Sequence, residues 1–369
     1  MKKILFITQN LARTGSEMVL WYLLNHLPQE EFKAYVFCIN RGELFEQLPE
    51  SIEKSISYKH SGSGTDKLFR GILKASGKDP FEYQLMRIHH RFQPDLWYVN
   101  SIAIPQIYPV AEKLPVKVAT HFHELLFAFT YLRKAEMEAV IRRSDYCIAC
   151  STSVLKNIER MGHQEVRLQP SFIDDTVIHT DPERVHQLRQ DLQLLESDFV
   201  WVISGSVIYM KGLNYIIDLL ESLKDRPDKI IWIGNSLHSG LDYFVQTTAA
   251  ENYPGKLIFT GPQSRDYFNY LALANGFLML SHEESFSLVL VEAAYSGIPI
   301  VSLNTGIASD FIKEGMGQVS KSANIEDIVS AMQQVRQEKA RTDLLKSEAS
   351  KFTVGQQIGS YLRLLREIT

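Results

Sequence analysis

The chain has 369 residues, of which 45% are hydrophobic and 22% are charged, and its formal net charge is −4. A chain of this length is long for one hydrophobic core, so we expect a globular protein of two domains. The charge gives no reason to expect nucleic acid, three cysteines are too few for a disulfide framework, and no uncharged apolar stretch reaches membrane-spanning length. We therefore expect a cytoplasmic location.

The first half of the chain alternates between apolar runs and segments with helical spacing. The apolar runs predict strands at Lys3 to Thr8, Ala34 to Ile39, Asp95 to Val99, Val116 to Thr120 and Asp145 to Ser151. After the first strand, Glu17 to Leu27 reads as a helix that turns Val19, Leu20, Leu23, Leu24 and Leu27 inward. The Gly15-Ser16 turn that opens this helix is an anion site in principle, although a purely structural turn explains it equally well.

The most basic part of the chain runs from Asp66 to Gln93. Its basic residues are Lys67, Arg70, Lys74, Lys78, Arg87 and Arg91, together with His89 and His90. Apolar residues lie among the first of these at roughly helical spacing, namely Leu68, Phe69, Ile72 and Leu73. This pattern is typical of an interfacial helix that touches anionic lipid, and equally of an ordinary amphipathic surface helix.

Two short motifs in this half resemble metal sites. The run from Val116 ends in Thr120-His121-Phe122-His123-Glu124, but three close polar residues without a distant fourth ligand are weak evidence for a metal. Cys147 and Cys150 are three positions apart in a predicted strand, which points their thiols to opposite faces. We therefore expect neither a chelate nor a disulfide there, and interpret both cysteines as buried small residues.

A second α/β domain begins at Phe199 to Ser204, which reads as a strand. The loop from Gly205 to Gly212 follows, and Lys211 precedes a glycine at the start of a helix. Such a lysine can hold a phosphate by its charge together with backbone amides, whereas a solvated loop lysine is the ordinary alternative. The remaining predicted elements are strands Lys229 to Gly234 and Lys256 to Thr260, a helix from Arg265, and two helices from Ile325 to the end.

The segment Ser281 to Thr305 carries the most chemistry. It follows an apolar strand, Gly276 to Leu280, and reads as a polar turn, a helix that stops at Ser296-Gly297, and a strand from Ile298 to Leu303. Glu284 and Glu292 are eight positions apart, which would place both close to one helical face. A carboxylate at the helix start can accept hydrogen bonds from sugar hydroxyls while nearby amides hold a phosphate. If these two glutamates are considered alone, the simpler interpretation is that Glu284 caps the helix and Glu292 is a solvated surface residue.

This segment resembles the Glu-x7-Glu signature of retaining, nucleotide-sugar-dependent glycosyltransferases of family four, which have the GT-B fold. The family pattern is roughly Pro-Ser-x-x-Glu-Gly-Phe-Gly, apolar residues, Glu-Ala, and Gly-x-Pro-Val-Val. The matching residues are Ser281, Glu284, Phe286, Glu292, Ala293, Gly297 and Pro299. Ser285 and Ser287 replace the two usual glycines, and Leu280 stands where proline is common.

The resemblance implies two Rossmann-like domains that face each other across a cleft. It implies an acceptor-side domain of residues 1–171, with the C-terminal helix 353–369 packing back on it, and a nucleotide-sugar-binding domain of residues 172–352. The implied reaction is retaining, metal-independent transfer of a sugar from a nucleotide sugar, a UDP- or GDP-sugar, to an acceptor hydroxyl. No cofactor is implied. The acceptor would be a glycan, a lipid-linked molecule or a protein, with peripheral membrane contact through the basic stretch 67–91, on the inner face of the membrane.

The resemblance also assigns residues. His123, Glu284 and Lys211 would be catalytic, with His123 and Glu284 holding the donor sugar and Lys211 the leaving diphosphate. Donor binding would involve Gly15, Ser16, Gly205, Ser206, Lys211, Gln263, Glu284, the amides of Ser285, Phe286, Ser287 and Leu288, and Glu292 on the ribose. Ser206 stands where the family usually has an arginine, and the glycine pair near Gly15 has lost one member.

Two other readings use the same fold. A GT-B epimerase or phosphorylase is not expected to carry the Glu-x7-Glu segment. A non-catalytic GT-B subunit, which binds sugar or peptide and supports a partner glycosyltransferase, stays open because of the losses at Ser206 and at Gly15-Ser16.

Overall fold

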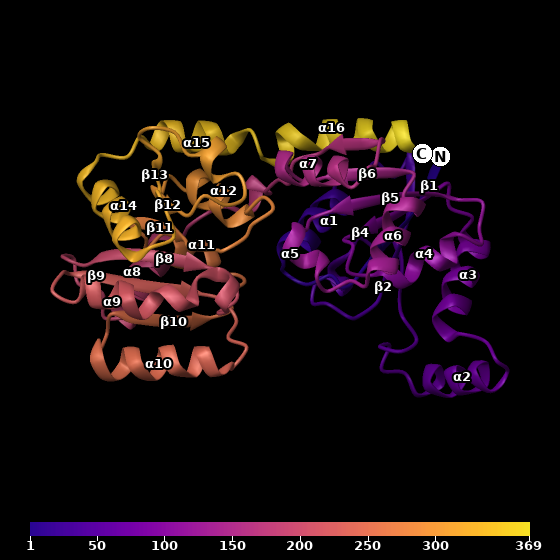
Figure 1. The fold of residues 1–369 in the computed structure, drawn as a ribbon, viewed down its shortest axis with the longest axis horizontal. Helices are drawn as coiled ribbons and strands as arrows, with labels where there is room; N and C mark the ends of the chain where they lie inside the picture. The colour runs from indigo at the N-terminus through magenta and orange to yellow at the C-terminus, as the bar shows by residue number, and fades with distance from the viewer. The chain divides into compact units, whose positions relative to one another are not determined.

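The structure is a computed structural model that describes residues 1–369. The chain divides into two compact units, Met1–Phe172 with Val354–Thr369 and Ile173–Thr353. Each unit is built around one parallel sheet with helices packed on it, which confirms the predicted α/β class (Figure 1). We refer to them as unit 1 and unit 2.

The sheet of unit 1 has seven parallel strands in the order β3-β2-β1-β4-β5-β6-β7. They are β1 (Lys2–Thr8), β2 (Phe32–Cys38), β3 (Glu53–Ile56), β4 (Leu96–Asn100), β5 (Lys117–Phe122), β6 (Tyr146–Ala149) and β7 (Val166–Leu168). The order reverses between β1 and β4, and the loops at the carboxyl ends of such neighbouring strands are where α/β sheets bind ligands. In register, Thr8 lies opposite Asn100 and Asn100 opposite His121 at this edge.

Unit 1 contains the helices of the first half of the chain together with the C-terminal helix. They are α1 (Gly15–Asn25), α2 (Gly64–Ala75), α3 (Pro80–Phe92), α4 (Tyr108–Ala111), α5 (Leu126–Phe129), α6 (Lys134–Arg143), α7 (Thr152–Arg160) and α16 (Val354–Ile368). The predicted inward residues of the first helical segment are all buried, although Leu27 lies just past the helix end. The edge strand β3 has the sequence EKSI, whose charges hide the apolar signal, and it was not predicted.

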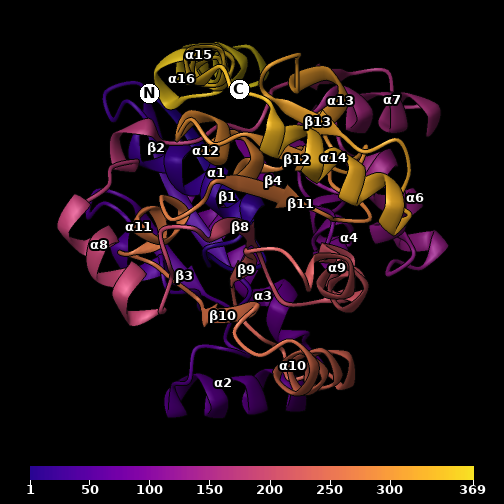
Figure 2. The ribbon, with the colours of Figure 1, turned by 90° about the vertical axis from the view of Figure 1, so that its left-hand side faces the viewer.

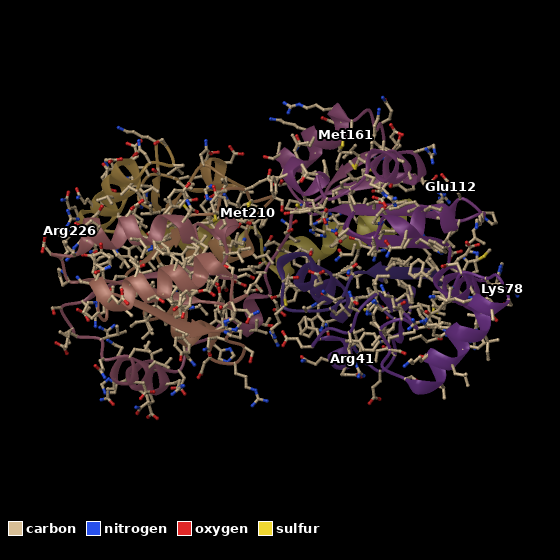
Figure 3. All side chains as sticks on the ribbon, turned by 60° about the horizontal axis from the view of Figure 1, so that its bottom comes forward. Arg41, Lys78, Glu112, Met161, Met210 and Arg226 are labelled. Atoms are coloured by element: carbon tan, nitrogen blue, oxygen red, sulfur yellow. The ribbon has the colours of Figure 1, made fainter.

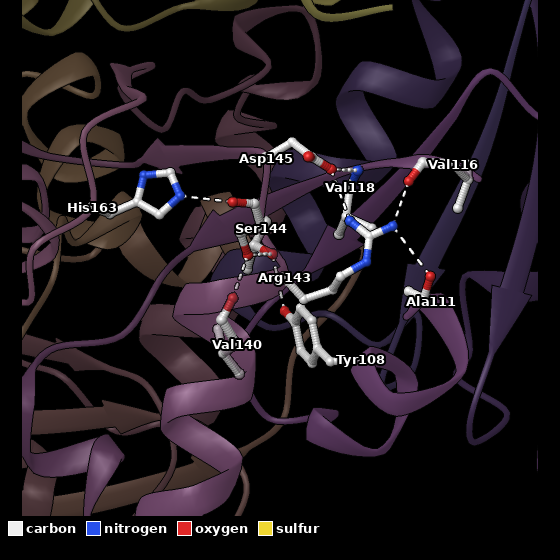
Figure 4. Close-up of polar contacts among 10 residues, drawn as sticks. Tyr108, Ala111, Val116, Val118, Val140, Arg143, Ser144, Asp145 and His163 are labelled. Atoms are coloured by element: carbon white, nitrogen blue, oxygen red, sulfur yellow. Dashed lines mark hydrogen bonds and ion pairs between the residues drawn. The ribbon is translucent and has the colours of Figure 1, made fainter. Parts of the chain in front are cut away.

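A partly buried polar network fixes the end of α6 against the sheet (Figure 4). Arg143 donates to the carbonyls of Ala111 and Val116 and pairs with Asp145 at 2.9 Å. The Ser144 hydroxyl lies 2.6 Å from the Thr120 hydroxyl and donates to the carbonyl four residues earlier at 2.7 Å. Because these bonds satisfy carbonyls at the end of α4, within α6 and directly before β5, the network has a structural role.

The C-terminal helix α16 belongs to unit 1. Its Tyr361 is fully buried, and its hydroxyl bonds the Tyr98 hydroxyl and lies 3.1 Å from Nδ1 of His121. Arg366 near its end pairs with Glu31 at 2.7 Å. The helix therefore ties the end of the chain to β4 and β5.

The sheet of unit 2 has six parallel strands in the order β10-β9-β8-β11-β12-β13. They are β8 (Phe199–Ser204), β9 (Asp228–Ile233), β10 (Leu257–Gly261), β11 (Gly276–Met279), β12 (Ile300–Ser302) and β13 (Gly317–Val319). Trp201 is fully buried, and its indole N–H donates to Asp228, which also pairs with Arg336. The first five strands lie where the sequence predicts them, within a few residues.

Unit 2 has more helices than the sequence predicts. They are α8 (Pro182–Asp191), α9 (Ile216–Leu223), α10 (Gly240–Asn252), α11 (Tyr267–Leu271), α12 (Leu288–Tyr295), α13 (Ala308–Phe311), α14 (Ile325–Gln337) and α15 (Thr342–Ser350) (Figure 2). The prediction of two helices after Ile325 is wrong, because α14, α15 and α16 are separate. No glycine or proline marks either break. Long-range pairing makes them, since Arg341 N donates to Gly315 O and Thr353 bridges to Ile173.

Charged side chains such as Lys78 and Glu112 point outward from the ribbon (Figure 3). No helix is both long enough and apolar enough to cross a membrane.

Candidate functional site

The centre of the site in unit 2 is an ion pair between two residues that the sequence singles out. The ammonium of Lys211 donates a hydrogen bond to Oε1 of Glu284, and the two side chains are 30% and 12% exposed. Lys211 ends a short 3₁₀ turn after β8, next to the position of Met210 in Figure 3, and Glu284 lies in the loop after β11. Because β8 and β11 are neighbours in the sheet, their carboxyl ends bring these loops together.

Glycine makes the close approach of these loops feasible. Gly212 has a φ of +89°, and a Cβ there would lie 2.5 Å from the carbonyl oxygen of Leu280 at the end of β11. Gly205 has a φ of +135°, and the Lys211 chain passes 3.6 Å from where its Cβ would be. Any side chain at Gly212 would push the lysine loop away from the Glu284 loop.

The predicted position of Glu284 at the start of a helix is wrong. Helix α12 begins at Leu288, so Glu284 lies in the preceding loop and does not share a helical face with Glu292. The helix cannot extend further back because Ser287 has a φ of +81°, a left-handed conformation. Phe286 is 3% exposed and packs against Phe352 at a centroid distance of 5.3 Å, so its side chain anchors the loop.

Glu292 is not the solvated surface residue of the simpler reading. The hydroxyl of Tyr267, on α11, donates to Oε2 of Glu292 at 3.0 Å and lies 3.0 Å from the hydroxyl of Ser204 at the end of β8. Burial raises the pKa of the Glu292 carboxyl to about 7, and the Tyr267 hydrogen bond only partly opposes this rise. A carboxylate held in this way is oriented for a ligand hydroxyl.

The other predicted donor residues of unit 2 lie on loops at the same edge of the sheet. Ser206 is exposed directly after Gly205, whose carbonyl accepts a hydrogen bond from Trp232 at 2.8 Å. Gln263 follows β10, and its side-chain amide donates to the carbonyl of Thr260 at 2.9 Å. Ser285 is partly exposed between Glu284 and Phe286, and Leu288 opens α12.

In unit 1, His123 lies just beyond β5 at the carboxyl edge of the sheet. Its Nε2 is 3.0 Å from Oδ1 of Asn100. Its ring centroid lies 3.8 Å from that of His121, with the two ring planes tilted by 48°, and His121 lies within β5 as predicted. Burial lowers the pKa of His123 to about 3, so this histidine is neutral at physiological pH. Glu124 accepts hydrogen bonds from the Ser101 hydroxyl and the His123 amide, while burial raises its pKa.

The start of α1 already carries a carboxylate. Gly15 is its first residue, and the buried Glu17 accepts hydrogen bonds from the hydroxyls of Thr14 and Ser16. The Ser16 carbonyl also accepts from Asn100 at 3.3 Å. A phosphate at this helix start would meet the charge of Glu17, which weakens it as an anion site.

Sequence reasoning missed three residues that shape the site. Tyr267 and Asn100 orient Glu292 and His123, and neither belongs to a motif that would single it out. His282 stacks on Tyr209 at a centroid distance of 4.5 Å, and its Nε2 lies 2.8 Å from Oδ1 of Asn214. This packing holds the Lys211 turn against the loop of Glu284.

Comparison with known proteins covers both units. The family model described as Glycosyltransferase Family 4 matches residues 13–177, and the one described as Glycosyl transferases group 1 matches residues 185–352. The alpha-galactosylglucosyldiacylglycerol synthase of Streptococcus pneumoniae is 26% identical over 67% of this chain and 70% of its own length. The N-acetyl-alpha-D-glucosaminyl L-malate synthase of Bacillus anthracis is 23% identical over 47% of this chain and 45% of its own length.

Solved structures match over the whole chain. Anabaena HepE in complex with UDP and glucose has a TM-score of 0.80 at 19% identity, with 100% of both chains covered. Sucrose-phosphate synthase from Thermosynechococcus elongatus has a TM-score of 0.79 at 14% identity, covering 100% of this chain and 99% of that one. The protein therefore belongs to the group 1, family 4 glycosyltransferases, enzymes that have the GT-B fold and transfer a sugar from a nucleotide-sugar donor.

Proposed function

We propose that this enzyme transfers the sugar of a UDP- or GDP-sugar to an acceptor hydroxyl with retention of configuration, in the synthesis of a polysaccharide, glycolipid or glycoprotein. The observation that carries the proposal is the Lys211–Glu284 pair, close to the start of α12 at the carboxyl edge of the unit 2 sheet. Two relatives support the choice of substrates. HepE has been solved with UDP-glucose, and the pneumococcal relative is named for a glycolipid product.

The proposed roles follow from the chemistry of each group. Lys211 and the amides from Ser285 to Leu288 stabilise the leaving diphosphate, on which negative charge grows in the transition state. Glu284 accepts hydrogen bonds from the donor sugar, and Glu292 accepts them from the ribose. Gln263 and its loop lie against the base. For His123 we keep the role that the resemblance implies, a hydrogen bond from a neutral ring to the donor sugar.

The bond changes need no protein nucleophile in this proposal. The bond between the anomeric carbon and the diphosphate oxygen breaks, and a bond from the acceptor oxygen to the anomeric carbon forms on the same face. The acceptor proton passes to the departing diphosphate. The protein then acts by positioning both substrates and by stabilising charge.

The test begins with a thermal-shift screen of the purified chain against nucleoside diphosphates and their sugars. A ligand that binds only the folded state raises the unfolding midpoint, so the bases and sugars that bind identify the donor. Turnover of that donor, alone and with glycan and lipid acceptors, should follow. If no nucleoside diphosphate shifts the midpoint, the proposed donor site is wrong.

A non-catalytic subunit remains a second candidate because of Ser206 and the start of α1. Ser206 supplies no positive charge to the loop of Lys211, and Glu17 places a negative one at the other predicted anion site. A protein that binds a nucleotide sugar or acceptor but turns over donor only with a partner enzyme would support this candidate. Turnover by the chain alone would exclude it.

The substitution Ser206→Arg is expected to tighten diphosphate binding. Ser206 is exposed, so a larger side chain can be accommodated, and a second cation would share the phosphate charge with Lys211. We expect an affinity for nucleoside diphosphate several-fold higher than wild type by calorimetry, with a steeper dependence on salt. The exposed Ser222 on α9 gives a matched control, since Ser222→Arg adds the same charge away from the site. Equal effects of both variants would contradict the prediction.

We also propose that α2 contacts anionic membranes. Leu68 and Ile72 are 69% and 56% exposed, whereas Phe69 packs inward on Tyr58 at a centroid distance of 5.6 Å. The exposed stripe of α2 consists of Gly64, Lys67, Leu68, Gly71, Ile72 and Ala75. An amphipathic helix that kept its apolar residues against the protein would not leave this stripe uncovered.

The expected result is salt-sensitive sedimentation of the protein with anionic vesicles. Lys67 and Lys74 are exposed and supply the charge, whereas Arg70 is partly committed to the carbonyls of Tyr58 and Lys59. Substituting Leu68 and Ile72 together by serine should abolish binding, because it removes the apolar area that the helix would bury in the membrane and leaves only the attraction that salt screens. Neutral vesicles are the control for charge. An unchanged bound fraction of the double variant at low salt would show that α2 is an ordinary surface helix.

A further inference from the structure

Ser287 stands out from the other residues of the site because nothing in the folded protein uses its hydroxyl. It is 8% exposed, and its Oγ has no hydrogen-bond partner. It precedes α12 directly, but its φ of +81° lies outside the extended range in which a serine caps a helix, and it makes no capping bond. Glycine adopts this conformation without strain, so a serine here costs stability twice.

A second hydroxyl close to this loop, that of Thr305, also lacks a hydrogen-bond partner. Oγ1 of Thr305 is buried and has no hydrogen-bond partner. Thr305 lies in the loop after β12, the neighbour of β11 in the sheet. This loop packs on the loop of Glu284, since Ile307 N donates to Phe286 O at 3.4 Å and a Cβ on Gly306 would lie 3.0 Å from Cβ of Glu284.

The charges around these loops decide the kind of ligand. The start of α12 presents amides and the positive end of its dipole, and Lys211, which pairs with Glu284, adds an ammonium whose side chain is 30% exposed. Hydroxyl groups next to such a positive region donate to the oxygens of an anion. A phosphate oxygen therefore fits better than a neutral sugar hydroxyl.

We propose that the hydroxyls of Ser287 and Thr305 donate hydrogen bonds to the diphosphate of the nucleotide donor. They supply part of the grip that Ser206, in place of an arginine, does not give. This inference rests on the proposed function, because it takes a nucleotide donor as the ligand. In this inference the side chain of Ser287 binds the ligand, and the strained backbone at Ser287 lowers the stability of the protein.

Ser287→Gly separates the two properties of this residue. Glycine relieves the left-handed strain, so the unfolding midpoint should rise by roughly 2–4 °C or more. It also removes the hydroxyl, so affinity for nucleoside diphosphate should fall by about tenfold, while affinity for the nucleoside alone should not change. Ser287→Ala should lose the same affinity without the rise in midpoint. Thr305→Val, which keeps the shape, should weaken diphosphate binding as well.

Gln193 provides the control for backbone strain. It has a φ of +52° and accepts a hydrogen bond from Lys229 at the start of β9, so it lies at the opposite edge of the sheet. Gln193→Gly should raise the midpoint and leave diphosphate affinity unchanged. Calorimetry with UDP or GDP, whichever wild type binds, and with the matching nucleoside measures each effect.

Three outcomes would overturn the inference. Wild-type diphosphate affinity in Ser287→Gly, Ser287→Ala and Thr305→Val would show that the hydroxyls do not reach the ligand. A loss seen only with the nucleotide sugar would place them on the sugar instead. If wild type binds no nucleoside diphosphate at all, the proposed function fails together with this inference, whereas wild-type binding combined with unaffected variants refutes the inference alone.

Discussion

Lys211→Ala is expected to lower kcat/KM for the donor by about a hundredfold or more, with kcat reduced as well as affinity. Lys211 is the cation that the structure pairs with Glu284 in the loop before α12. Charge on the diphosphate grows as its bond to the sugar breaks, so removing one strong electrostatic donor costs more in the transition state than in the ground state. Alanine also leaves the 12% exposed Glu284 unpaired, which adds repulsion toward the diphosphate.

Glu284→Gln is the matched variant for this experiment. It breaks the same ion pair but leaves the lysine free, so nucleoside diphosphate should bind at least as tightly as to wild type. Turnover should nevertheless fall, because the proposed contact with the sugar hydroxyls is weakened. Steady-state kinetics, calorimetry with nucleoside diphosphate and circular dichroism on both variants make the comparison. A folded Lys211→Ala protein with near wild-type turnover would place the diphosphate elsewhere.

The parallel strands could be read from the sequence because burial on both faces leaves continuous apolar runs. Phe199 to Ser204 and Gly276 to Leu280 are examples, and the structure confirms both as strands. The edge strand β3 and the last strand β13 could not be predicted because each is short and only partly buried. The separation of α14, α15 and α16 could not be predicted because backbone pairing with distant residues interrupts the helices.

For the site, spacing and chemistry identified Lys211 and Glu284, and the structure brings them together. The same reasoning placed Glu284 on a helix, because nothing in a serine predicts the left-handed φ that delays the start of α12 to Leu288. Partners such as Tyr267 could not be found either. Its hydrogen bond to Glu292 depends on the packing of α11 beside the end of β8, and no local pattern records such a contact.

Glu292→Gln is expected to change stability and nucleotide binding in opposite directions. Burial raises the pKa of Glu292 to about 7, so between pH 4 and pH 7 the unfolded chain loses this proton while the folded chain keeps it. The contribution of Glu292 to the free energy of unfolding is therefore fully present below the pKa of the unfolded chain. It falls as the pH rises through this window and is lost above the pKa of the folded protein. Since one pKa unit corresponds to about 1.4 kcal/mol, the total is on the order of 3 kcal/mol.

The side-chain amide introduced by Glu292→Gln cannot ionise but can still accept the hydrogen bond of Tyr267. The stability of the variant should therefore not fall as the pH rises through this window. At pH 8 its unfolding midpoint should exceed that of wild type by several degrees, and at pH 4 the two should coincide. Thermal unfolding across this range measures the difference. Glu251→Gln, which removes an exposed carboxylate from α10, is the control and should show no such trend.

Nucleotide affinity should fall in the same variant by about tenfold or more, because a charged acceptor for the ribose hydroxyls becomes a neutral one. In wild type, affinity for a nucleoside diphosphate should rise as the pH increases through 7 and Glu292 ionises, whereas the variant should lack this rise. Calorimetry at pH 6 and pH 8 tests both statements. A variant that is more stable at pH 8 yet binds nucleotide like wild type would support the raised pKa of Glu292 and contradict its proposed contact with the ribose. A variant less stable than wild type at pH 8 would instead show that the carboxylate is needed for packing with Tyr267.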